Sequence, residues 1–126
     1  MSPRFSATAF EQLVVQALDE LPEFFRAQLQ NIEVLIADWP TREERREAGL
    51  APDELLLGLY QGIPLTERTS DYGLVLPDTI TLYQRPIEQI CQTPEEVMAQ
   101  VQQTVRHELA HHFGISDDRL QELGAY

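Results

Sequence analysis

Residues 93–114, TPEEVMAQVQQTVRHELAHHFG, contain the clearest structural signal in the sequence. Thr93 is a good N-cap, Pro94 suits the first helical position, and Glu96 completes a Thr-x-x-Glu capping box. Gly114 supplies the left-handed residue that commonly ends a helix. We therefore predict one long helix that begins at Pro94 and ends just before Gly114.

All three histidines of the chain lie near the end of this helix, where residues 107–111, HELAH, form an HExxH motif. Helical positions four apart are separated by one turn and about 40°. His107 and His111 are therefore able to reach one metal ion, and zinc is the metal that this motif favours. Glu108 is placed to touch a metal-bound water rather than the metal, so we predict that it is the general base.

A catalytic zinc site uses three protein ligands and keeps one position open, so a third ligand has to be found. The acidic candidates that follow the motif are Asp117, Asp118 and Glu122. We predict Asp117, because Gly114 lets the chain turn back sharply and Asp117 lies on the returning arm. The alternative is that Asp117 caps a final short helix, a role for which Ser116 competes.

Apolar side chains recur along one side of the long helix and predict the side that packs on the core. They belong to Val97, Met98, Val101, Val105 and Leu109. His112 falls in the same stripe, which predicts a histidine that is packed or that supports a metal ligand, rather than a third ligand itself, because adjacent helical positions diverge by about 100°.

The first part of the chain predicts two helices and a strand. Residues 8–20 carry apolar side chains at helical spacing. Residues 22–30 form a second short helix with Pro22 at its first position. Residues 32–37, IEVLIA, predict a buried strand because they are rich in β-branched side chains.

A charged segment follows, in which Thr41 and Glu44 predict a capping box and Gly49 a helix stop. Such a run of charges favours a solvated face, with a partner-docking loop as the alternative.

Residues 55–61 and 79–85 predict two more strands, separated by a long and functional loop. In the second strand the alternation predicts that Ile80 points inward and Tyr83 outward. Two short helical turns, over residues 86–91 and 115–123, complete the predicted elements.

The composition predicts a single domain over residues 1–126, because 126 residues with 43% hydrophobic side chains are enough for one core. Nine basic and 21 acidic residues give a net charge of −12, which disfavours nucleic acid as a partner. The absence of lysine excludes Schiff-base and P-loop lysine chemistry.

Cys91 is the only cysteine, so no intramolecular disulfide forms, and we predict a small buried side chain there. No stretch of sequence has the pattern of a signal peptide or of a membrane span. We therefore predict a cytoplasmic protein with no membrane partner.

Residues 107–117, HELAHHFGISD, resemble the HExxHxxGxxD motif of metzincin-type zinc peptidases. Over roughly residues 10–124 the chain is similar to the small bacterial minimal-zincin metallopeptidase-like family, through LLGLYQGIPLTER, YGLVLPDTITLYQRPIE and HELAHHFGISDDRLQELG. The resemblance implies a small α/β (α+β) domain in which the HExxH helix packs on a mixed sheet. It assigns zinc binding to His107, His111 and Asp117, and the base role to Glu108.

These observations predict a zinc-dependent peptidase that acts on a peptide or protein substrate through a metal-activated water. The strand over residues 79–85 is the predicted edge on which an extended peptide lies. An oxyanion-stabilising side chain is sought among Tyr60, Arg68, Tyr72 and Tyr83. Two alternatives stay open, a metal-binding interaction module with little peptidase activity and a metal-dependent ribonuclease, although the acidic charge disfavours the second.

Overall fold

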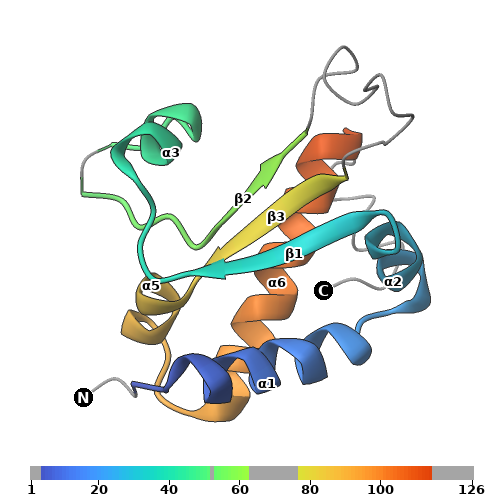
Figure 1. Ribbon diagram of the computed structural model, residues 1–126, viewed down its shortest axis with the longest axis horizontal. Helices are drawn as coiled ribbons and strands as arrows, with labels where there is room; N and C mark the ends of the chain where they lie inside the picture. Colours follow the sequence, from blue (N-terminus) through green and yellow to red (C-terminus); the bar gives the residue numbers. More distant parts are fainter. Residues whose placement is uncertain (1–3, 52, 63–76, 115–126) are drawn as a thin grey trace, which may run out of the picture.

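The computed structural model describes residues 4–51, 53–62 and 77–114, which form five helices and a three-stranded sheet (Figure 1). The sheet order is β1-β3-β2. β1 (Ile32–Ala37) runs parallel to β3 (Asp78–Tyr83), and β2 (Gly58–Gln61) runs antiparallel to β3. A mixed sheet with helices packed on it confirms the predicted α+β class.

The long helix α6 spans Pro94–Phe113, as predicted. The Thr93 hydroxyl accepts a hydrogen bond from the backbone N–H of Glu96 at 3.1 Å, and Gly114 ends the helix at a φ of 69°. The capping box is only half formed, because the Glu96 carboxylate accepts from the N–H of Gln92 instead of that of Thr93. The helix is therefore fixed at both ends by the residues that the sequence singled out.

The remaining helices are α1 (Ala7–Asp19), α2 (Glu23–Leu29), α3 (Arg42–Glu47) and α5 (Gln84–Gln89). Of these, α3 is capped as the sequence predicts, and α5 begins two residues before the predicted turn over residues 86–91. Thr41 and Glu44 form a reciprocal capping box with bonds of 3.0 and 2.8 Å, and Gly49 follows α3 at a φ of 73°. Pro22 is the N-cap of α2 rather than its first helical residue, a shift of one position from the prediction.

The main core lies between the sheet and the layer formed by α1 and α6 (Figure 1). Fully buried apolar side chains come from four of the helices and from β3, and burying one of them stabilises the fold by about 1.5–3 kcal/mol. From the helices they include Phe10, Ala17, Phe25, Ile87, Val97, Val101 and Val105, and from β3 Ile80 and Leu82. Cys91 is buried among them, as predicted.

The opposite face of β3 packs in a smaller cluster, in which Tyr83 is fully buried with Leu56 and Leu59. Tyr83 lies on the face opposite Ile80 and Leu82, as the alternation predicts, but that face is covered too, so the prediction that Tyr83 is outward-facing is wrong. A central strand is covered on both faces, so alternation along its sequence does not tell a core face from a solvated one.

The sheet order also corrects two strand predictions. The strand over residues 79–85 was predicted as an edge but is the central strand, whereas β1 was predicted as buried and is an edge with Glu33 and Leu35 exposed. β2 begins at Gly58, three residues later than predicted. β-branched composition indicates a strand, but the order of strands depends on tertiary pairing.

Two predicted segments lie outside the described residues, namely the loop between β2 and β3 over most of its length and the final turn over residues 115–123. Among the described helices, none has the length and apolar character that a membrane crossing requires.

A buried carboxylate fastens the beginning of the chain to α5. Glu88 is 2% exposed. Its Oε2 accepts from the N–H of Phe5 at 2.7 Å and from Gln84 Nε2 at 3.1 Å, and its Oε1 accepts from Arg85 Nη1 at 2.8 Å. Burial raises the pKa of Glu88, but these three donors outweigh it, so the pKa is lowered below its ordinary value.

We expect Glu88→Gln to lower the free energy of unfolding at pH 7 by about 1–3 kcal/mol, because an ionised acceptor is lost from three bonds. A lowered pKa stabilises the fold above the unfolded-state pKa near 4.5, and this stabilisation is lost as the pH falls through the folded-state pKa. Urea unfolding at pH 7 and pH 3 measures the difference between the two proteins. A difference that is equally large at both pH values would contradict this assignment.

Candidate active site

The three motif residues lie on the last turns of α6, next to β2. His107 and Glu108 are half-buried, and His111 is exposed. The helical spacing places both imidazoles on one side, with the Glu108 carboxylate close enough to feel the charge of each. Two imidazoles and a carboxylate thus lie on consecutive turns of a single helix.

The backbone of β2 holds the Glu108 side chain in place. The N–H of Tyr83 on β3 donates to the C=O of Leu57 at 3.0 Å. In an antiparallel pair, residues that hydrogen-bond to the partner strand alternate with residues that do not. Tyr60 is three residues after Leu57, so its backbone N–H points away from β3. Glu108 Oε1 accepts that N–H at 2.8 Å. The edge of β2 therefore holds one oxygen of the carboxylate, Oε1, through a backbone N–H.

The close approach of β2 to α6 depends on Gly58. A Cβ at this position would lie 2.6 Å from Thr104 Cγ2 on α6 and 3.2 Å from the Thr81 carbonyl oxygen on β3. Only glycine fits there without a shift, so the absence of a side chain lets Tyr60 reach Glu108.

Opposing effects set the pKa of Glu108. Burial raises it, and the hydrogen bond from Tyr60 and the charges of His111 and His107 lower it, with burial the larger effect. The net pKa is raised above the ordinary glutamate value, which makes the carboxylate a stronger proton acceptor than an exposed one.

His112 lies in a polar cluster and not in the core. Its ring stacks on that of Tyr60 with centroids 4.0 Å apart, and its Nε2 is 3.9 Å from Asp78 Oδ2. The Tyr60 hydroxyl donates to the same oxygen at 2.5 Å. The prediction that His112 packs in the core-facing stripe is wrong, because its side chain is 38% exposed and covers the edge of the sheet.

The side chains predicted as candidates to stabilise an oxyanion lie in different environments. Tyr83 is fully buried, and its burial and the nearby Glu44 carboxylate raise the pKa of its hydroxyl. It therefore does not reach a substrate. Tyr60 stands at the site with its hydroxyl bonded to Asp78. Arg68 and Tyr72 lie outside the described residues.

A hollow of about 420 Å³ opens beside Glu108 and His111. One side is polar, and the other is formed by apolar residues that follow α3 and lead into β2. The apolar lining is Ala48, Leu50, Leu56, Gly58 and Leu59. Sequence reasoning missed this wall and also Asp78, for which the only signal was an acidic residue at the start of a strand.

Within the described ranges, no three metal-ligating side chains gather around one point. The donor set that is present, two imidazoles one helical turn apart beside a carboxylate, suits zinc in its chemistry. Asp117, the predicted third ligand, lies outside the described residues, as do Asp118 and Glu122.

Comparisons with known proteins agree with this geometry. A family model described as "Zincin-like metallopeptidase" matches residues 29–125. A solved structure of a conserved hypothetical protein from Thermus thermophilus is similar at 29% identity and a TM-score of 0.53, over 86% of this chain and 94% of that chain. No curated protein matches the sequence.

We expect Gly58→Ala to lower the free energy of unfolding by about 1–3 kcal/mol, because the new methyl group overlaps Thr104. Thr104→Ser removes the Cγ2 atom that collides, so the double variant recovers part of the loss. Denaturant unfolding of the wild type, both single variants and the double variant measures the coupling. Strictly additive losses would contradict the proposed contact.

Proposed function

The chain belongs to the zincin-like metallopeptidase family, and from this premise we propose that it is a zinc-dependent peptidase. In this proposal His107, His111 and Asp117 hold the metal, and Glu108 is the general base. The observation that carries it is the position of Glu108, which lies beside both imidazoles with one oxygen fixed by Tyr60.

His107, His111 and Asp117 would hold the zinc, which when bound would supply a coordinated water of lowered pKa and would polarise the carbonyl of the peptide bond. Glu108 takes the proton from the attacking water at Oε2, since Oε1 already accepts the Tyr60 N–H. The same carboxyl group then delivers that proton to the leaving amine. Its raised pKa suits both halves of this transfer.

The substrate is proposed to be a peptide in extended conformation. β3 is central among the described strands, and the outward N–H of Tyr60 on β2 is bonded to Glu108, so the peptide is proposed to lie in the hollow beside β2 and not along β3. The apolar wall of the hollow fits an apolar side chain next to the bond that is cleaved.

We expect purified protein to bind about one zinc per chain, and His107→Ala or His111→Ala to remove it, because each variant deletes one of two helical ligands. Metal analysis of the purified proteins measures this effect.

Asp117→Ala should lower the affinity for zinc far more than its matched control Asp118→Ala, because loss of a ligand costs more than loss of a neighbouring charge. Competition with a chelator measures the two affinities. Equal zinc affinity in the two aspartate variants would assign the third ligand elsewhere.

Glu108→Gln tests the enzyme directly. The amide oxygen still accepts the Tyr60 N–H but takes no proton from water, so zinc should stay bound while peptide hydrolysis falls by about 100-fold or more. Wild type and variant are compared on the same mixed peptide library, because contaminating peptidases act equally in both preparations. If zinc-loaded wild type cleaves nothing faster than the variant does, the chain is a metal-binding module and not a peptidase.

A further inference from the structure

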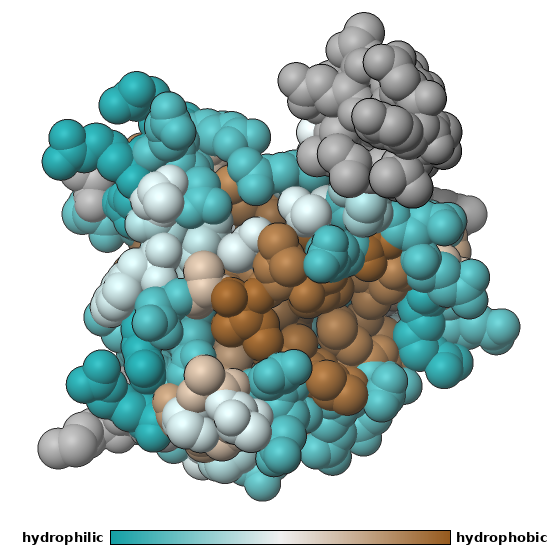
Figure 2. All heavy atoms as spheres, viewed as in Figure 1, coloured by the Kyte–Doolittle hydropathy of each residue, from teal (hydrophilic) through white to brown (hydrophobic). Residues whose placement is uncertain are grey.

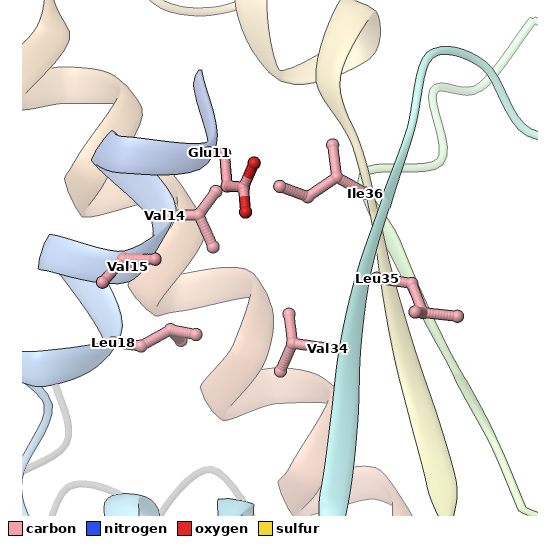
Figure 3. A pocket seen from close by; sticks show the side chains of 7 residues that line it. All are labelled: Glu11, Val14, Val15, Leu18, Val34, Leu35 and Ile36. Atoms are coloured by element: carbon pink, nitrogen blue, oxygen red, sulfur yellow. The ribbon is translucent and has the colours of Figure 1, made fainter. Parts of the chain in front are cut away.

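A second surface lies between helix α1 and the outer edge of β1, and it shares no lining residue with the hollow beside Glu108. Figure 2 shows an apolar patch in the middle of this face with hydrophilic residues around it. A groove of about 360 Å³ runs there. Its walls are Val14, Val15 and Leu18 on α1 and Val34, Leu35 and Ile36 on β1 (Figure 3).

The groove lies beside an unpaired strand edge. β1 pairs only with β3 among the described strands, so alternate residues of β1 direct their N–H and C=O groups away from the sheet. A strand added there would lie about 4.8 Å from β1. Its side chains on the helix side would reach α1, where Val15 is 52% exposed.

The acidic side chains of α1 and β1 favour a binding segment that carries basic residues. α1 carries Glu11 and Asp19, β1 carries Glu33, and neither element contains a basic residue. Glu11 points into the space between helix and strand (Figure 3) and makes no ion pair with a described residue. A second copy of this chain would place these carboxylates against their own copies, which disfavours self-pairing.

We propose that the β1 edge and the α1–β1 groove bind an extended segment of a partner protein in which apolar and basic residues alternate. Backbone groups of the segment pair with β1, its apolar side chains fill the groove, and its basic side chains lie on the opposite face of the added strand, where they approach Glu33. This binding does not depend on zinc or on peptide hydrolysis, and thus stands apart from the proposed peptidase activity.

The probe is a fluorescein-labelled octapeptide with valine at alternate positions and lysine or threonine between them. Its binding to the intact protein is measured by fluorescence anisotropy. We expect Val15→Asp to weaken binding at least tenfold, and the matched control Ile90→Asp, at a site 48% exposed on another part of the surface, to leave it unchanged. Equal binding by both variants and wild type would overturn the proposal.

Charge selection is tested by replacing each lysine of the probe with glutamate, which should abolish binding to wild type. Glu33→Lys should remove the preference for the lysine peptide, because its side chain is exposed and the change is confined to the surface. If the Glu33→Lys protein still prefers the lysine peptide as strongly as wild type does, charge selection at β1 is overturned.

Backbone pairing is tested without any change to the protein. Only alternate N–H groups of an added strand face β1, so N-methylation of the valines and N-methylation of the residues between them should differ. We expect one methylated probe to lose binding and the other to keep it. Equal effects of the two would overturn strand addition, and a concentration-dependent dimer that Val15→Asp dissolves would show that a second copy covers this face.

Discussion

The hydrogen bond from the Tyr60 N–H to Glu108 joins the edge of the sheet to the turn of α6 that carries the HExxH motif, and the rest of the candidate site depends on it. It forms because Gly58 leaves room for β2 to lie against Thr104. The same strand carries the Tyr60 ring, which stacks on His112 and bonds Asp78. One close approach thus orients the proposed base and organises the polar side chains around it.

The sequence was sufficient to predict the elements that local signals govern. Thr93, Pro94 and Gly114 define α6, and Thr41 and Glu44 define α3, because caps act within one turn. The HExxH spacing likewise places His107, Glu108 and His111 by helix geometry alone. Strand order, the burial of Tyr83 and the place of His112 were not accessible in this way, because each depends on which segments pair across the sheet.

Two surfaces with different chemistry follow from this arrangement. The edge of β2 meets the motif helix and the hollow beside Glu108, whereas the edge of β1 meets α1 and an acidic, apolar groove. Among the described strands β1 and β2 are the two edges of the sheet, and they lie on opposite sides of β3. The proposed docking surface uses strand addition at β1, whereas the proposed peptidase site uses the hollow beside β2.

The most direct test of the central claim is X-ray absorption spectroscopy at the zinc edge of the loaded protein. The account expects two imidazole nitrogens at about 2.0–2.1 Å, with oxygen donors in the remaining positions. The His111→Ala protein should show at most one imidazole on whatever zinc it retains. A spectrum with sulfur scattering, or one unchanged by the substitution, would mean that the metal binds elsewhere and would contradict the account.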